Sequence, residues 1–316
     1  MNIGLDMMGG DFAPLEAVKG VLAYIKEKSG SGSIPHLFLV GNEEQITPLL
    51  AEFQIPVSSY TLVATTEVIE MNEHPTKALK EKQDSSIARG FGLLKTGQID
   101  AFISAGNTGA MLVGTIFSIK AIEGVIRPTV STIVPRENGK TGLILDVGIN
   151  ADCKPEMLNQ FAILGSGYAE DILGIENPTV GLINIGEEEG KGNILAQATY
   201  PLLKENTAIN FIGNIEGRDI LDDKADVMIC DGFTGNILLK LLESLHPITE
   251  RQHIHHPYFD RFNFEQYGGS PVLGVEKPVI ICHGISGATA FKNMVILAEK
   301  MINSEMLVKM KEKLQG

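Results

Sequence analysis

Two kinds of segment alternate along almost the whole chain. Short, nearly continuous apolar runs are followed by longer stretches in which apolar residues recur at helical spacing. An unbroken apolar run suits a strand that is buried on both faces of a parallel sheet. Regular alternation with helices therefore predicts a three-layer α/β/α fold with a mostly parallel, mixed sheet. The predicted strands are 2–5, 36–40, 101–104, 130–134, 142–146, 180–184, 210–212, 227–230 and 279–282, and the predicted helices are 14–27, 75–94, 155–173, 193–204 and 288–301.

One local pattern occurs three times. An apolar run leads into x-Gly-x-Ser/Thr-Gly at 105–109 (AGNTG), 231–235 (DGFTG) and 283–287 (HGISG), and helical spacing follows each time. Glycines allow a tight strand-to-helix turn, and the Ser or Thr is expected to cap the helix. Free N–H groups at a helix start bind anions, which predicts a site for phosphate-like groups. The alternative is that the turns serve only as helix caps. The candidate phosphate- or substrate-binding residues in them are Gly106, Thr108, Gly109, Gly232, Thr234, Gly235 and His283.

Two further loops carry candidate chemistry. The first strand runs into Asp6, Gly9 and Gly10, where the backbone can approach a ligand and the carboxylate is expected to hold a cation or cap the turn. The loop 184–193 contains Lys191 between two glycines, which leaves the lysine free to reach an anion or remain a solvated surface charge. Neither loop has the dinucleotide fingerprint G-x-G-x-x-G or a Walker ending.

The segment 238–267 departs from the alternation. An amphipathic stretch at 238–245 is expected to end at His246-Pro247, and aromatic residues and histidines follow. We expect a single domain over residues 1–316 with this segment as a projecting arm, which either carries function or packs two subunits together. No metal site is expected, because Asp260 is the one further ligand at suitable spacing to the histidines.

Composition and charge narrow the function. A net charge of −13 disfavours nucleic-acid binding, which needs a basic surface. Three unevenly spaced cysteines argue against a disulfide scaffold, and Cys230 and Cys282 are expected to be buried and reduced. No secretory or membrane-spanning apolar run is found, so a cytoplasmic location is the default expectation.

A series of motifs extends over nearly the whole length of the chain: 6–14, 104–110, 127–128, 145–148, 150–152, 184–193, 214–219, 231–236, 267–269 and 283–284. By these motifs the chain resembles the bacterial phosphate acyltransferases of the PlsX type, which make acyl-phosphate from acyl-acyl carrier protein for phospholipid synthesis. Phe12 departs from the family pattern, which usually has histidine there, so no general base is assigned to that position.

This resemblance implies a fold similar to that of the isocitrate and isopropylmalate dehydrogenases and the phosphotransacetylases. It also implies a cytoplasmic homodimer, peripheral at the membrane, that needs no cofactor. Acyl carrier protein and inorganic phosphate would be its substrates, and the membrane glycerol-3-phosphate acyltransferase would use its product. Phosphate is itself an anionic nucleophile, so the protein must position the reactants and stabilise an oxyanion. We expect Lys191 to neutralise charge, and the side-chain amides of Asn107 and Asn236 to orient the reacting groups.

Three alternatives stay open at this point. A phosphotransacetylase acting on acyl-coenzyme A would use the same fold and the same nucleophile. A metal- and NAD-dependent decarboxylating dehydrogenase shares the architecture, but it should show an aspartate cluster and an adenine-binding loop, neither of which is found. A non-catalytic scaffold would be favoured if no anion bound the glycine turns.

Overall fold

The structure is a computed structural model that describes residues 1–29 and 34–315. These residues divide into two compact units. Unit 1 comprises Met1–Lys120, Phe264–Pro271 and Val275–Asn303, and unit 2 comprises Ala121–Asn263, Val272–Gly274 and Ser304–Gly316.

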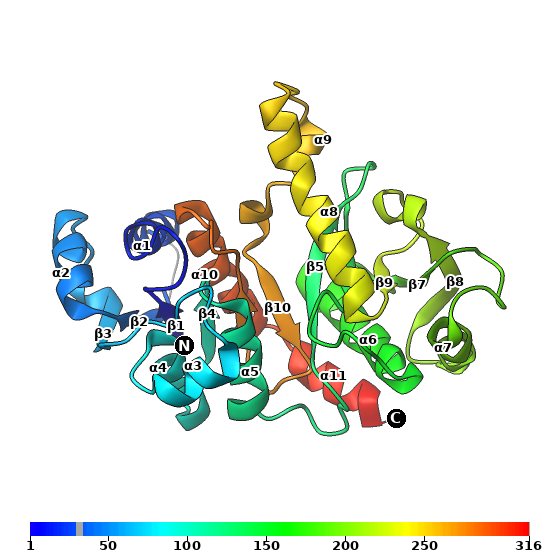
Figure 1. The fold of residues 1–316 in the computed structure, drawn as a ribbon, viewed down its shortest axis with the longest axis horizontal. Coiled ribbons are helices and arrows are strands. Elements are labelled where there is room, and N and C mark those ends of the chain that lie inside the picture. The colour runs from blue at the N-terminus through cyan, green and yellow to red at the C-terminus, as the bar shows by residue number, and fades with distance from the viewer. Residues whose placement is uncertain (30–33, 316) are drawn as a thin grey trace. The chain divides into compact units, whose positions relative to one another are not determined.

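Unit 1 is built on a run of parallel strands in the order β3-β2-β1-β4-β11. Figure 1 shows α1 and α10 on one side of these strands and α4 and α5 on the other. Every residue of β4 and β11 is buried, as their unbroken apolar runs predict. The strands are β1 (Asn2–Asp6), β2 (His36–Gly41), β3 (Tyr60–Ala64), β4 (Ala101–Ser104) and β11 (Val279–Ile281). The helices are α1 (Leu15–Lys28), α2 (Glu43–Glu52), η1 (Val57–Ser59), α3 (Pro75–Glu81), α4 (Ser86–Thr96), α5 (Thr108–Ser118), η4 (Phe264–Tyr267) and α10 (Ala288–Asn303).

Unit 2 has a mixed sheet in the order β10-β5-β6-β9-β7-β8, in which the last two residues of β10 supply the pairing with β5. The β10–β5 and β5–β6 pairs are antiparallel, and the remaining pairs are parallel. The strands are β5 (Thr129–Pro135), β6 (Thr141–Leu145), β7 (Thr179–Asn184), β8 (Asn210–Glu216), β9 (Val227–Ile229) and β10 (Ser270–Leu273). The helices are α6 (Pro155–Tyr168), η2 (Ala169–Leu173), α7 (Ile194–Glu205), η3 (Gly217–Leu221), α8 (Gly232–Arg251), α9 (Pro257–Asp260) and α11 (Met306–Gln315).

The predicted α/β fold with a mostly parallel, mixed sheet is confirmed, but two helix predictions are wrong. The segment 75–94 forms two helices, because Ser85 caps a new helix by accepting from the N–H of Ala88 at 3.3 Å. The helix that starts the arm does not end at Pro247 but continues to Arg251. A proline removes its own N–H from the helix, and the turns on either side of Pro247 nevertheless keep their helical geometry.

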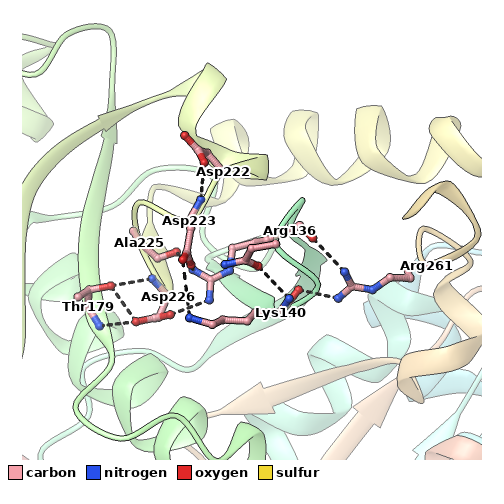
Figure 2. A network of polar contacts seen from close by, with 9 residues as sticks. Arg136, Lys140, Thr179, Asp222, Asp223, Ala225, Asp226 and Arg261 are labelled. Atoms are coloured by element: carbon pink, nitrogen blue, oxygen red, sulfur yellow. Dashed lines mark hydrogen bonds and ion pairs between the residues drawn. The ribbon is translucent and has the colours of Figure 1, made fainter. Parts of the chain in front are cut away.

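A buried guanidinium holds together the amino ends of β7 and β9 in unit 2 (Figure 2). Arg136 is 1% exposed, and it contacts the carboxylates of Asp226 at 2.7 Å and Asp223 at 3.0 Å. The second carboxylate oxygen of Asp226 accepts from the backbone N–H and the hydroxyl of Thr179. Burial acts to raise the pKa of Asp226, but the Thr179 and Arg136 contacts outweigh it and the pKa is lowered. Removing one partner of such a buried pair costs about 3–5 kcal/mol.

The base of the predicted arm is attached to the β5–β6 hairpin, whose turn contains Arg136. The guanidinium of Arg261 donates to the backbone carbonyl of Arg136 at 2.9 Å and to that of Lys140 at 2.6 Å (Figure 2). Phe262 beside it is buried. Arg261 therefore acts as an anchor for this segment.

Candidate functional site

The first glycine loop lies over a buried carboxylate at the end of β1. Asp6 is 1% exposed; it accepts from the Ser104 hydroxyl at 2.6 Å and from the Met8 N–H at 3.0 Å. The Ser104 oxygen in turn accepts from the Gly106 N–H at 2.9 Å. Burial raises the pKa of Asp6, and its hydrogen bonds only partly oppose that effect. The buried carboxylate of Asp6 thus holds the loop in place through hydrogen bonds to the Ser104 hydroxyl and the Met8 N–H.

Two glycines of this loop are required by space and by backbone conformation. A Cβ on Gly9 would lie 2.5 Å from the Asp6 carboxylate and 2.6 Å from the Gly106 nitrogen, so no larger residue fits. Gly10 has φ +101°, a conformation that L side chains rarely adopt. Next to it, the N–H of Asp11 donates to the Gly284 carbonyl, which joins this loop to the third turn. As phosphate ligands, Gly9 and Gly10 stay a prediction.

In the first turn, Asn107 caps α5 and also holds a neighbouring loop. Its side-chain oxygen accepts from the N–H of Ala110 at 2.9 Å. Its amide nitrogen lies within hydrogen-bond distance of three backbone carbonyls in the loop 70–73. Asn107 is 4% exposed, and both ends of its amide are hydrogen-bonded within the protein. This geometry suits a role in positioning the loop 70–73 at the start of α5. The N–H groups of Thr108 and Gly109, at the first two helical positions, have no intrahelical acceptor.

The second turn is packed against a loop organised by Asp146. This carboxylate is fully buried and accepts from the N–H groups of Val130, Gly148, Ile149 and Asn150, and from the Asn150 side chain. The turn attaches to this loop through the following contacts: Gly232 N–H donates to the Asn150 carbonyl at 2.8 Å, and the Asn236 amide donates to the Val147 carbonyl at 3.1 Å.

Close approach explains the last glycine of both turns. A Cβ on Gly235 would collide with the backbone carbonyl of Asp146, and a Cβ on Gly109 would collide with the ring of Pro75. A side chain is therefore blocked at both positions. Asn236 itself is exposed, and among the residues that the structure describes its amide oxygen and second amide hydrogen have no hydrogen-bond partner.

The third turn differs because carboxylates already occupy the helix start. The N–H of Gly287 donates to Glu265 at 2.6 Å, and the N–H of Ala288 donates to Glu16 at 2.9 Å. His283 is half-buried, and its ring packs edge-on against Phe264 with centroids 4.6 Å apart. Two of the N–H groups predicted to bind an anion at this helix start are therefore already bonded to carboxylates of the protein.

The predicted capping by Ser or Thr is wrong in all three turns. The helices begin at different positions of the shared pattern, so the cap is Asn107 in the first turn and Asp231 in the second. Asp231 binds both the N–H and the hydroxyl of Thr234 at 2.9 Å. Sequence reasoning gave no site role to Asp146, Glu16 or Glu265. A carboxylate directly after a buried strand, as at Asp6, is the signal that could have identified Asp146.

The loop 184–193 presents Lys191 at the surface of unit 2. The Asn184 side chain donates to the Lys191 carbonyl at 3.1 Å, and the stem of Lys191 lies over Gly186. Two glutamates of the adjacent acidic run are engaged elsewhere: Glu187 pairs with Lys224, and Glu189 pairs with Lys204 at 2.9 Å. In the described part of the chain, the ammonium of Lys191 forms no ion pair, so it is available to an anion.

The cysteines of unit 2 are unsuited to nucleophilic chemistry. Burial raises the pKa of Cys153 to about 12, and burial raises that of Cys230 well above its ordinary value. A thiol reacts as its thiolate, so both are inert near neutral pH. Cys230 and Cys282 are buried and unbridged, as expected.

Over 1–29 and 34–315, no group of three or more histidine, cysteine, aspartate or glutamate side chains is placed to hold a metal ion. Within the same ranges, no helix combines the length and the apolar character needed to span a bilayer.

Comparisons with known proteins identify the family. The family model described as "Fatty acid synthesis protein" matches residues 1–252 and 255–309. A phosphate acyltransferase of Dictyoglomus turgidum is 44% identical over 331 aligned positions, covering 99% of this chain and 97% of that protein. The phosphate acyltransferase of Aquifex aeolicus is 44% identical, covering 96% of this chain and 94% of that protein.

Solved structures agree on the fold. A phosphotransacetylase from Streptococcus pyogenes aligns with a TM-score of 0.65 at 18% identity, covering 95% of this chain and 94% of that chain. A branched-chain phosphotransacylase from Enterococcus faecalis aligns with a TM-score of 0.61 at 14% identity, covering 96% and 99%. At these identities the likeness concerns the fold alone. The family match and the high-coverage relatives show that this chain belongs to the fatty acid synthesis protein family.

Proposed function

We propose that this protein is a phosphate acyltransferase that moves the acyl group of an acyl-acyl carrier protein onto inorganic phosphate. Its family and its relatives support acyl transfer to phosphate. The observation that carries the proposed chemistry is the lysine of the loop 184–193. Two of the three glutamates beside Lys191, Glu187 and Glu189, are already paired with other lysines, and Lys191 itself forms no ion pair within the described residues, which leaves its positive charge for an anionic substrate.

The reaction needs no protein nucleophile. A phosphate oxygen attacks the thioester carbonyl carbon, a C–O bond forms, and the C–S bond breaks as the sulfur leaves with the carrier as a thiolate. The protein must therefore bind phosphate and stabilise the oxyanion of the tetrahedral intermediate. Lys191 would supply the charge for this step. In the same unit as Lys191, the free amide atoms of Asn236 would orient the reacting groups.

The mutation Lys191→Ala tests this proposal. We expect turnover to fall by about 10²-fold, the usual scale for one lost electrostatic contact in a transition state, while the fold is unchanged. The measurement is acyl-phosphate formation from acyl-acyl carrier protein and phosphate, with circular dichroism as the check on folding. Lys204→Ala is the matched control, because Lys204 lies on the adjacent helix and is already paired with Glu189. Near-normal turnover in Lys191→Ala would remove this lysine from the mechanism.

The same assay separates the two acyl donors. Activity with the acyl-carrier protein and little with acyl-coenzyme A supports the proposal, and the reverse preference indicates a phosphotransacetylase. Absence of activity with both donors would favour a non-catalytic scaffold. We also propose that the protein acts in the cytoplasm at the membrane periphery, where the membrane glycerol-3-phosphate acyltransferase would take up the acyl-phosphate.

An exposed apolar stripe on α8 supports the proposal of a homodimer. Phe233, Ile237, Leu241 and Ile248 recur at helical spacing, and they are 64%, 54%, 60% and 42% exposed. Such a contiguous apolar face on a soluble protein usually marks an interface. Pairing two copies of α8 across a two-fold axis would bury the stripe.

The mutation Leu241→Glu places a charge in the centre of this stripe. We expect it to shift the protein from dimer to monomer in light scattering coupled to gel filtration, because the charge would be buried on pairing. Val57→Glu, at a position in unit 1 that is 78% exposed, is the control and should leave the assembly unchanged. A wild-type monomer, or a dimer that survives Leu241→Glu, would contradict the proposed interface.

The acyl carrier protein would need local positive charge for docking on this acidic chain. Arg251 at the end of α8 is exposed and available for this role. Arg261 is already used to anchor the arm.

A further inference from the structure

Unit 2 contains a cavity beside the loop that carries Lys191. It lies at the carboxyl ends of β7 and β9, next to α6 and the first turn of α7, and has a volume of about 460 Å³. This volume is within the range of about 300–1,000 Å³ that is typical of small-molecule sites. The lining residues are Leu158, Leu182, Ile183, Asn184, Ile185, Gly192, Asn193, Leu195, Ala196, Cys230, Asp231 and Thr234.

The walls of this cavity are mainly apolar. Leu158 and Leu182 are core residues at 1% exposure, and Leu195 and Ala196 come from the first turn of α7. Cys230 contributes a buried thiol that burial keeps protonated, so it behaves as a small apolar group. The interior therefore offers dispersion contacts and little that would bind a charged group.

The polar residues of the lining already have partners within the protein. The two carboxylate oxygens of Asp231 accept from the N–H and the hydroxyl of Thr234. The Asn184 side chain donates to the Lys191 carbonyl and accepts from the Ile185 N–H. The Asn193 side chain accepts from the Ala196 N–H at 2.8 Å. A ligand in the cavity would thus gain mostly by burying apolar surface.

The polar side of the cavity coincides with the candidate site. Asn184, Gly192 and Asn193 belong to the loop that presents Lys191, and Thr234 belongs to the second glycine turn. A ligand with an apolar tail and a reactive carbonyl at one end would have its tail among the leucines and its carbonyl beside this loop.

We propose that this cavity binds the fatty acyl chain of the donor and that Leu195 helps to set the chain length. This inference rests on the proposed acyl transfer, because an acyl thioester is the substrate whose apolar tail ends in the reacting carbonyl. The phosphate would bind elsewhere, at N–H groups and positive charge, which the apolar walls lack. Transfer of the chain from water into the cavity contributes affinity in proportion to the methylenes that it buries.

Leu195 is the residue best placed to test the cavity. It is half-buried at the second position of α7, where a change of side chain alters the cavity without disturbing the deep core. Ile194, directly before it, is 88% exposed and does not line the cavity. The two neighbours therefore form a matched pair, one facing the cavity and one facing solvent.

The experiment measures kcat/KM for acyl-phosphate formation with a series of saturated acyl-acyl carrier proteins that lengthens by two methylenes at each step. In the wild type, kcat/KM should rise by up to roughly four-fold per methylene until the cavity is filled, and then level off. Leu195→Phe reduces the cavity volume, so kcat/KM should level off at a shorter acyl chain than in the wild type, and donors with short chains should be affected little. Leu195→Ala enlarges the cavity, so kcat/KM should level off at a longer acyl chain than in the wild type. Ile194→Phe should leave the profile as in the wild type.

The outcomes distinguish this inference from the proposed function. If no donor of any length reacts, the proposed function itself fails. If the wild type reacts but both Leu195 variants keep its chain-length profile, the cavity does not bind the acyl chain. A uniform rise in KM at every chain length would also overturn the inference, because it indicates binding of the carrier's common thiol arm. Thermal unfolding of each variant confirms that the comparison is made on folded protein.

Discussion

Asp6 in unit 1 and Asp146 in unit 2 occupy similar positions relative to the strands β1 and β6. Each stands at the carboxyl end of a buried strand, each is almost fully buried, and each precedes a glycine-containing loop. Their partners differ. Asp6 shares its carboxylate between the Ser104 hydroxyl and backbone N–H groups, whereas the five hydrogen bonds to Asp146 all come from nitrogen donors.

This difference in partners determines whether each aspartate can be protonated or replaced by an amide without loss of hydrogen bonds. A hydroxyl can rotate to donate or to accept, so the partner of Asp6 can adapt to a protonated acid or an amide. An N–H group can only donate, so the partners of Asp146 require acceptor oxygens. The loop of unit 1 is therefore expected to depend on shape, and the loop of unit 2 on the carboxylate itself.

The largest effect is expected from alanine at the last glycine of the second turn. In Gly235→Ala the methyl group meets the Asp146 carbonyl, which is backbone and cannot turn aside, so we expect a loss of about 3 kcal/mol or more in the free energy of unfolding. Gly109→Ala, at the same position of the first turn, meets the ring of Pro75 at the start of α3. This short helix can move aside more easily than the buried backbone at Asp146, so the loss should be clearly smaller. Urea unfolding measures both. Equal losses would mean that the two turns are under the same constraint.

Asp146→Asn is expected to have an intermediate effect. The new amide group faces N–H donors wherever it is placed, so at least one of them loses its acceptor at a cost of about 1–3 kcal/mol. The matched control is Asp152→Asn, an exposed aspartate of the same loop, which should unfold like the wild type. A stability of Asp146→Asn within error of that control would show that shape, and not the carboxylate, holds this loop.

Asp6→Asn is expected to have the smallest effect, within about 1 kcal/mol at acidic pH, because the Ser104 hydroxyl can reverse its hydrogen bond. The effect should change with pH. Burial raises the folded-state pKa of Asp6 above the unfolded value of about 3.9. Its contribution to stability is therefore complete below the unfolded pKa and is lost as the pH rises through the folded pKa.

The amide of Asp6→Asn does not titrate, so the variant should gain stability relative to the wild type as the pH is raised through this window. Urea unfolding at a series of pH values measures the difference. A difference that is constant with pH would show that Asp6 does not titrate differently in the folded chain.

Much of the fold could be predicted because its strands bury both faces. The runs at 101–104, 227–230 and 279–282 became fully buried strands within one residue of their expected ends. The strand β3 was missed, because most of its residues are only half-buried and it is paired on one side alone. The division of 75–94 into two helices depends on Ser85, whose capping role is not visible in an apolar pattern.

The turns and loops that carry the candidate residues could be predicted from the sequence, but the partners of those residues could not. The three glycine turns and the Lys191 loop are where the patterns placed them. The same five-residue pattern nevertheless starts its helix at different positions, and the third turn is capped by Glu16 and Glu265 from distant parts of unit 1. Local spacing carries no information on such long-range partners. The apolar cavity was not predicted for the same reason, since α6, β7, α7 and β9 meet there only in the folded chain.

The anchoring of the arm has a consequence for how this chain can vary in evolution. Arg261 binds the main-chain carbonyls of residues 136 and 140, and it makes no use of their side chains in doing so. Every residue type supplies a carbonyl, so the hairpin can change at position 140 without losing the arginine's acceptor. The attachment is thus insensitive to substitution at position 140 of the hairpin. The outer part of the arm can therefore diverge in length and composition while Arg261 keeps its base attached to the hairpin.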